Sequence, residues 1–298
     1  MEEIINKTMD RSDLSTDQAV TIVEALNALI TQLYSQGLYM TSWYGTLPVG
    51  PGLSKDKVRR LIKKVLGRKI DDQVHVGMDN RGRGYQPLPS SADDGRIPWY
   101  LYWEVFWVMT RGPRLGPEMR LLDAGGVSSL FTCYLASLGY EVHSIDLNKT
   151  LISNANKIAK AADWRMFSYL MDMEKLDFED EFFDHAYSIC VFEHLHFAAK
   201  QAALSEIARC LKPNGILSIT FDYRNPAPLI WNCGFDQSER NQLKTEEDIR
   251  RNFLSTGSFV LLRNEQFYDN GESYLVHQDL AFGRGLYTFG AIFLMKKS

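Results

Sequence analysis

The spacing of apolar residues changes along this chain near residue 119. Before that point, apolar residues recur every three to four positions within 15–37 and within 55–69, which predicts two amphipathic helices. Lysines and arginines cover most of the second helix. Pro98 opens a short aromatic helix, and residues 71–96 have no period, which indicates a long loop.

From residue 119 onward, short apolar runs alternate with helical patterns. Five runs have the length of buried strands: 120–122, 141–145, 167–170, 183–189 and 215–221. This alternation predicts a parallel sheet with helices on both faces. Two further strand-like runs, 258–266 and 286–296, have no convincing helix between them, so we expect an antiparallel pair at the sheet edge. The predicted fold class is therefore α/β, with a seven-stranded, mostly parallel sheet that closes on an antiparallel strand pair and follows an N-terminal helical region.

The change of pattern divides the chain into two predicted parts, a helical extension or cap over residues 1–117 and an α/β domain over residues 118–298. A formal net charge of −4 argues against a nucleic-acid binder, although local basic patches can still act. No apolar run approaches the length of a membrane span, and the polar, acidic start lacks the features of a secretion signal. The cysteines are too widely spaced for a CxxC metal site or a disulfide framework: Cys133, Cys190, Cys210 and Cys233. We therefore expect a cytoplasmic protein with reduced cysteines.

Residues suited to a nucleotide follow the first two strands, at the edge where open α/β sheets bind ligands. The turn over 123–129 contains Gly125 and Gly126, which let the backbone turn sharply and bring a ligand close to the amides of the next helix. Asp146, followed by Leu147, comes about 20 residues later, where such folds place an acid against ribose hydroxyls. The turn is not GxGxxG, which weakens a dinucleotide interpretation.

Two further segments follow the next predicted strands. Asp172 could accept a hydrogen bond from an adenine amino group, while Met171 and Met173 offer apolar contact to the ring. Residues 190–194 then end the fourth strand on the same edge. Together with the glycine turn, these residues describe a site for adenosine.

With these features, the chain resembles the class I S-adenosylmethionine-dependent methyltransferases, with a Rossmann-like, type 11-like domain. The resemblance runs from about residue 119 to the C-terminus and rests on LLDAGGVSS, EVHSIDLN, YLMDMEKLDFEDEFFDHAYSICVFEHL, ARCLKPNGILSITF and the closing strand pair. It implies a methyltransferase with S-adenosyl-L-methionine as its cofactor. In that family the glycine turn approaches the methionine moiety, the acid after the second strand binds ribose, the third segment binds adenine, and the fourth lines the site. The implied cofactor-binding residues are Asp123, Gly125, Gly126, Asp146, Leu147, Met171, Asp172, Met173, Cys190 and Val191.

The glycine turn departs from the family pattern D-x-G-x-G-x-G at two positions. Val127 and Ser129 stand where the second and third glycines of that pattern lie. Because a β-branched side chain disfavours positive φ, we expect a negative φ at Val127 and slightly less room for the cofactor.

His194 is the candidate catalytic residue, because an imidazole near the methyl-transfer centre can take a proton from a hydroxyl or amine acceptor. The alternative is that Glu193 and His194 begin a helix and pack structurally. Some ubiquinone-pathway O-methyltransferases with a similar Glu-His segment use an upstream glutamate in a metal site. Cys190 stands at that position here, so no metal site is predicted.

Two other segments are candidates for acceptor binding. The aromatic helix that follows Pro98 is expected to be mainly core but to take part in the active site. The segment 221–226 combines an acid, a phenol and Arg224, whose guanidinium could hold a carboxylate or phosphate. The equal alternative is a polar loop that Pro226 ends.

The predicted function is methyl transfer to an oxygen or nitrogen of a polar small molecule, such as a sugar or another metabolite. One alternative is an RNA or protein methyltransferase that docks through the basic helix 55–69, although a nucleic-acid partner is disfavoured. Another is a non-catalytic binding module whose altered turn no longer holds cofactor. No membrane span is expected, and the oligomeric state is open, with a homodimer as one option.

Overall fold

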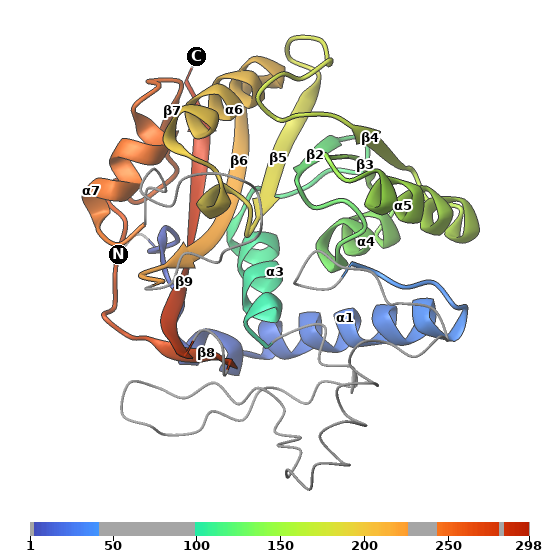
Figure 1. Cartoon of the computed structure of the whole chain (residues 1–298), viewed down its shortest axis with the longest axis horizontal. Helices are drawn as coiled ribbons and strands as arrows, with labels where there is room; N and C mark the ends of the chain where they lie inside the picture. Colours follow the sequence, from blue (N-terminus) through green and yellow to red (C-terminus); the bar gives the residue numbers. More distant parts are fainter. Residues whose placement is uncertain (1–2, 42–98, 226–242, 280–282, 298) are drawn as a thin grey trace, which may run out of the picture.

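A computed structural model describes residues 3–41, 99–225, 243–279 and 283–297 of the chain (Figure 1). Five parallel strands form one half of a central sheet: β2 (Arg120–Ala124), β3 (Glu141–Asp146), β4 (Met166–Leu170), β5 (Phe183–Ile189) and β6 (Leu211–Tyr223). The other half is built on the long strand β9 (Gly283–Lys296), which pairs antiparallel with β6. Three strands pair antiparallel with β9: β1 (Lys7–Thr8), β7 (Phe259–Leu261) and β8 (Tyr274–Asp279).

The strand order is β1-β9-β6-β5-β2-β3-β4, with β7 and β8 also paired to β9. The predicted α/β fold, with its mostly parallel sheet and antiparallel C-terminal pair, is confirmed. The sheet of the described residues has nine strands rather than seven, because β1 and β8 are added along β9. The strand expected over 258–266 is shorter than predicted and ends at Leu261.

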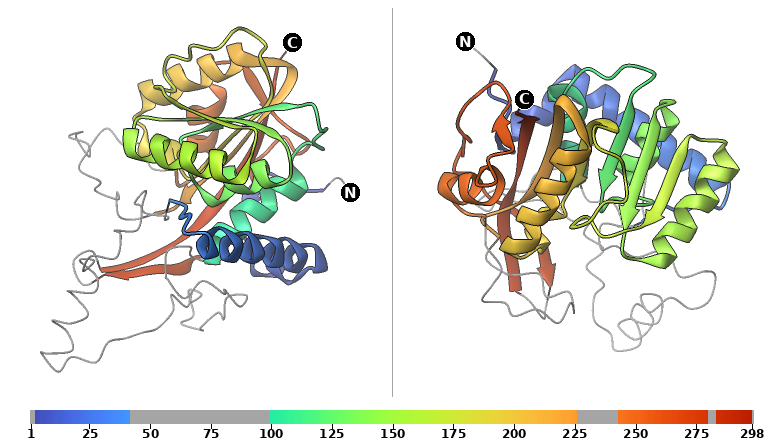
Figure 2. Two further views of the ribbon diagram at one scale, coloured as in Figure 1. Left: turned by 90° about the vertical axis from the view of Figure 1, so that its right-hand side faces the viewer. Right: turned by 90° about the horizontal axis from the view of Figure 1, so that it is seen from above.

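Side chains of the parallel strands alternate between two hydrophobic cores, as buried strands in a sheet require. Leu121 points into one core and Leu122 into the other. The first core contains α1 (Asp17–Ser35), α3 (Trp99–Arg111), α4 (Leu130–Ser137) and α5 (Lys149–Ala162). The second contains α6 (Phe197–Cys210), α7 (Glu246–Ile249) and the π-helical turn Arg250–Leu254. Figure 2 shows α1 and α6 on opposite sides of the sheet.

The N-terminal residues are built into this sheet rather than only covering it. The Asn6 side chain accepts a hydrogen bond from the Phe293 amide (2.7 Å) and donates one to the Leu262 carbonyl (2.8 Å). Residues of α1 and α3 share one core with β9. The boundary predicted near residue 117 stays a prediction, and residues on both sides of it contribute to the same core.

Side-chain caps fix where the helices near the sheet edge begin. Thr16 caps α1, and Asn148 caps α5. Ser129 caps α4, and His196 caps α6 by accepting from the Ala199 amide (3.2 Å). These helices therefore start at fixed positions beside the strand ends. Within the described residues, no helix is long and apolar enough to cross a membrane.

Candidate functional site

The glycine turn after β2 lies against the segment that follows β5. Gly125 has a φ of 87°, and its amide donates to the Ile145 carbonyl at the end of β3 (3.0 Å). A Cβ atom at Gly125 would lie 2.8 Å from both γ-methyl carbons of Val191. A Cβ at Gly126 would lie 2.6 Å from the Asp123 carboxyl carbon. Both positions therefore require glycine, for conformation and space at Gly125 and for space at Gly126.

Asp123 lies beneath this turn. Its side chain is fully buried, and one oxygen accepts a hydrogen bond from the Thr132 hydroxyl at the start of α4. The other oxygen has no hydrogen-bond partner among the described residues. Burial raises the pKa of Asp123 to about 7, and the hydrogen bond from Thr132 opposes this rise. Asp123 thus ties the turn to α4, and its direct contact with a cofactor stays a prediction.

The two unusual residues of the turn have structural roles. The positive φ falls on Ser128 (65°) and not on Val127, so the expected negative φ at Val127 is confirmed. The Val127 side chain is buried in the first core, and the Ser129 hydroxyl accepts from the Thr132 amide (3.1 Å) to cap α4. The carbonyl of Ser128, between them, accepts a hydrogen bond from the Thr41 amide (2.7 Å). Val127 and Ser129, in place of the two family glycines, therefore add a core contact and a helix cap.

The ends of β3 and β4 bring the predicted ribose and adenine residues next to each other. Asp146 pairs with Leu170 across the two strands, and the Met171 amide donates to the Asp146 carbonyl (3.1 Å). The half-buried Asp146 side chain accepts from the Asn148 amide (2.7 Å), and burial raises its pKa. Leu147 is 69% exposed.

In the segment 171–173, which is predicted to bind adenine, the acid Asp172 is exposed to solvent. The Asp172 side chain is exposed and accepts from the Glu174 amide (3.0 Å). Met171 and Met173 are partly buried against the second core. The structure thus joins this segment to the end of β3, while the contacts of its side chains with a cofactor stay predictions.

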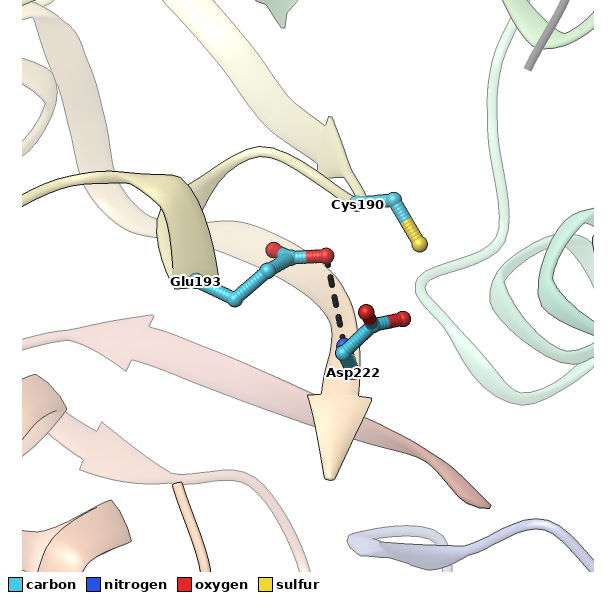
Figure 3. Close-up of side chains that lie close together, drawn as sticks. All are labelled: Cys190, Glu193 and Asp222. Carbon is cyan, nitrogen blue, oxygen red and sulfur yellow. Dashed lines mark hydrogen bonds between the residues drawn. The ribbon is translucent and has the colours of Figure 1, made fainter. Parts of the chain in front are cut away.

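A cluster of acidic groups lies just after β5 and at the C-terminal end of β6 (Figure 3). Cys190, Glu193 and Asp222 each offer an atom that could ligate a metal ion, and these three atoms lie within 4.8 Å of one another. The Glu193 carboxylate accepts from the Asp222 amide (3.2 Å), and the Cys190 thiol donates to Glu104 of α3 (2.7 Å). We call Glu104, Cys190, Glu193 and Asp222 the acidic cluster.

Glu104 and Asp222 of the acidic cluster are buried, Cys190 and Glu193 are partly buried, and the cluster is only partly hydrogen-bonded. Glu104 is fully buried and Asp222 is 6% exposed. One carboxylate oxygen of Glu104, Glu193 and Asp222 each has no hydrogen-bond partner among the described residues. Asn225 donates to the other oxygen of Asp222 (2.9 Å). Buried polar groups without partners are costly, so this arrangement favours a ligand that satisfies them.

Burial and mutual repulsion favour the protonated forms of the acidic cluster. Burial raises the pKa of Glu104 to about 8 and that of Asp222 to about 7. Burial, followed by the charge of Asp222, raises the pKa of Glu193 well above its usual value. The Cys190 thiol has a raised pKa for the same reasons, burial first and the carboxylates second. A cation in the cluster would reverse these effects.

The sequence pointed to only part of this cluster. Cys190 was predicted to line the cofactor site, and the aromatic helix was predicted to take part in the active site without a named residue. Glu104 was missed, although a single acid in the apolar run WYLYWEVFWVM is a signal of a buried functional group. Asp222 was predicted only as part of the acceptor-binding segment 221–226, with a polar loop as the equal alternative. Its link to the other acids was not predicted, because these lie on α3 and after β5.

His194 follows Glu193 in a short 3-10 helix, Phe192–His194, and its side chain is exposed. Its role as a base stays a prediction. Arg224 is already engaged, since its guanidinium forms an ion pair with Asp269 (3.4 Å) and donates to the Glu272 carbonyl. The basic helix 55–69 lies outside the described residues.

Comparison with known proteins agrees with this geometry. Residues 122–219 match the family model described as "Methyltransferase domain". A curated relative, "Uncharacterized methyltransferase YodH" of Bacillus subtilis (strain 168), is 31% identical over 113 residues, which cover 38% of this chain and 47% of the relative. The chain thus spans about half the length of this relative.

Two solved structures are similar to part of this chain at low sequence identity. A SAM-dependent methyltransferase from Methanosarcina mazei is 18% identical, with a TM-score of 0.46 over 61% of this chain and 94% of that chain. Phosphoethanolamine N-methyltransferase 2 of Haemonchus contortus is also 18% identical, with a TM-score of 0.49 over 67% and 53% of the two chains. Residues 122–219 are therefore similar to a methyltransferase domain, and the strand order and the glycine turn agree with the predicted resemblance to class I S-adenosylmethionine-dependent methyltransferases.

Proposed function

We propose that this protein transfers the methyl group of S-adenosylmethionine to an oxygen or nitrogen of a polar small molecule, such as a sugar or another metabolite. The proposal rests on one observation: the segments that follow β2, β3 and β4 are hydrogen-bonded to one another at one edge of the sheet. Gly125 is hydrogen-bonded to the end of β3, and Met171 is hydrogen-bonded to Asp146. The turn, the ribose acid and the adenine segment therefore form one continuous edge.

The residues at this edge fit the cofactor. Gly125 has no side chain and Val191 packs against it, so no Cβ of the turn residue stands between its backbone and a ligand. Asp146 presents a half-buried carboxylate for the two ribose hydroxyls, and Met171 offers an apolar surface beside it. When bound, S-adenosylmethionine supplies a methyl group already activated by its sulfonium sulfur. The remaining proposed cofactor contacts are those of Asp123, Gly126, Leu147, Asp172, Met173, Cys190 and Val191.

The protein's own residues would orient the acceptor and remove its proton. Cys190 of the acidic cluster directly precedes Val191, whose methyl groups lie against Gly125 of the glycine turn. Carboxyl groups there can hold the hydroxyls of a polar acceptor in line for transfer, which lowers the entropic part of the barrier. His194, next to Glu193, would then take the proton of a hydroxyl acceptor.

A transfer assay tests this proposal. The protein would be incubated with S-adenosylmethionine labelled in its methyl group and with separate pools of polar metabolites, RNA and protein. We expect label in the metabolite pool, and at least a ~100-fold lower rate for His194→Ala. Label confined to RNA or protein would contradict the substrate class. A near-normal rate for His194→Ala would remove its role as base and leave the transfer itself intact.

A further inference from the structure

The acidic cluster holds more acid groups than acceptor binding alone requires. Three carboxyl groups and a thiol come from α3, β6 and the segment after β5, which are far apart in the sequence. Each carboxyl keeps one buried oxygen without a hydrogen-bond partner among the described residues. Such groups are stable together only when they are neutral or when a cation compensates them.

Two cationic side chains near the acidic cluster are also bonded to other groups. Lys200 attracts Glu193 from α6, but its ammonium donates to the Asn252 side chain (3.0 Å), and burial lowers its pKa to about 8. Arg224 is two residues from Asp222, but its guanidinium is paired with Asp269 (3.4 Å). The Thr220 and Tyr287 hydroxyls contact Glu104 and Asp222, but they carry no positive charge, so full charge compensation is left to a bound cation.

We propose that Cys190, Glu193 and Asp222 bind a divalent transition-metal ion, with Zn²⁺ as the ion that suits this donor set. Three donor atoms within 4.8 Å of one another have the spacing of ligands around one ion. One thiolate and two carboxylates suit zinc, whereas magnesium and calcium prefer oxygen donors alone. Three protein ligands also leave a fourth position open, as in catalytic zinc sites.

The surrounding residues support the ligands in the way that metal sites require. Glu104 contacts the Cys190 sulfur, and Asn225 donates to the Asp222 carboxylate (2.9 Å). These contacts orient two of the three ligands. Cys190 also has a φ of 53° at the end of β5, an uncommon conformation for a residue with a side chain. This proposal departs from the sequence-based expectation of no metal site, because a thiol is itself a zinc ligand and the third ligand comes from β6.

Zinc binding is independent of the proposed function, whereas a role for the ion in holding the acceptor oxygen rests on it. The full chain would be stripped with a chelator and titrated with Zn²⁺ by calorimetry and with Co²⁺ by absorption spectroscopy. We expect a Zn²⁺ site and a thiolate-to-cobalt charge-transfer band. Cys190→Ser should abolish the band, and the matched control Cys210→Ser, whose thiol lies outside the cluster, should keep it. Asp222→Asn should weaken Zn²⁺ binding ~100-fold or more, since even supporting residues cost ~10- to 100-fold.

Several results would overturn the metal site. These are no Zn²⁺ uptake by the unmodified chain, a cobalt band that survives Cys190→Ser, or unchanged affinity in Asp222→Asn. Binding of tetramethylammonium that depends on Asp222, in a protein that takes up no Zn²⁺, would instead mark the cluster as a site for an organic cation. Calorimetry with S-adenosylmethionine on the same stripped protein separates the two proposals. Cofactor binding without Zn²⁺ uptake refutes only the metal site, and Zn²⁺ uptake without cofactor binding refutes only the methyltransferase function.

Discussion

Replacement of Gly125 by alanine tests whether the glycine turn is shaped by its contact with Val191. Gly125 has a φ of 87°, which costs a residue with a side chain ~1–2 kcal/mol. Its new Cβ would also lie 2.8 Å from both Val191 γ-methyl carbons, and overpacking of this kind costs ~1–3 kcal/mol. We therefore expect Gly125→Ala to lower the free energy of unfolding by roughly 2–5 kcal/mol.

Gly139 provides a matched control for this substitution. Its φ is 89°, close to that of Gly125, but a Cβ atom added there would meet no heavy atom of the described residues within 4 Å. Gly139→Ala should therefore show only the backbone cost, ~1–2 kcal/mol. Urea unfolding measures both values, and the difference between the two variants isolates the contact with Val191.

A second substitution at the contact completes this experiment. Val191→Ala in the Gly125→Ala background removes the methyl groups that the new Cβ would meet, so it should restore part of the lost stability. Equal losses in Gly125→Ala and Gly139→Ala, together with no rescue by Val191→Ala, would refute the close approach of the turn to Val191.

The remaining predictions concern the acid below the turn, the helix cap and the ribose acid. Burial raises the pKa of Asp123 from 3.8 to about 7. Between these pH values the folded chain holds a proton that the unfolded chain has lost. The free energy of unfolding should therefore fall as the pH rises, and Asp123 contributes roughly 4 kcal/mol to this fall. Unfolding measured from pH 4 to pH 8 should show a flatter dependence for Asp123→Asn, and an unchanged slope would contradict the buried, protonated acid. Ser129→Ala removes the cap of α4 and should lower the melting temperature through a loss of ~0.5–2 kcal/mol, while an unchanged melting temperature would argue against the cap. Asp146→Ala should weaken S-adenosylmethionine binding by ~1.5–3 kcal/mol in calorimetry, and unchanged affinity would refute the ribose contact.

Much of the fold could be predicted from the sequence because buried parallel strands leave a clear pattern. The run 183–189 matches β5, and β2, β3 and β4 differ from their predicted ranges by at most two residues at an end. The strands that were missed depend on partners distant in the sequence. β1 has only two residues and is held by pairing with β9, and β8 forms along the same strand.

The candidate site could be predicted where its residues follow a strand in a fixed order. The sequence placed the glycine turn, Asp146 and the methionine segment at the correct strand ends. It did not link Glu104 or Asp222 to Cys190, because these contacts join elements separated by 86 and 32 positions and arise only when the sheet and α3 pack together. A short sequence window carries no signal for such contacts.

The turn itself illustrates the limit of a family pattern. Val127 and Ser129 differ from the expected glycines, and the pattern alone suggested reduced space for the cofactor. In the structure the Val127 side chain is buried in the first core, and Ser129 caps α4. The two residues therefore stabilise the loop, and the glycine that the turn requires for its conformation is Gly125.

Calorimetric titration of the full chain with S-adenosylmethionine tests the central claim most directly. We predict saturable binding to one site per chain, and weaker binding in Asp146→Ala, whose carboxylate ends β3 beside the glycine turn. Gly139→Ala, whose backbone lies outside this edge, should bind the cofactor as the unmodified protein does. The absence of any binding heat at high ligand concentration, in a chain that unfolds cooperatively, would contradict the assignment of this edge as a methyl-donor site.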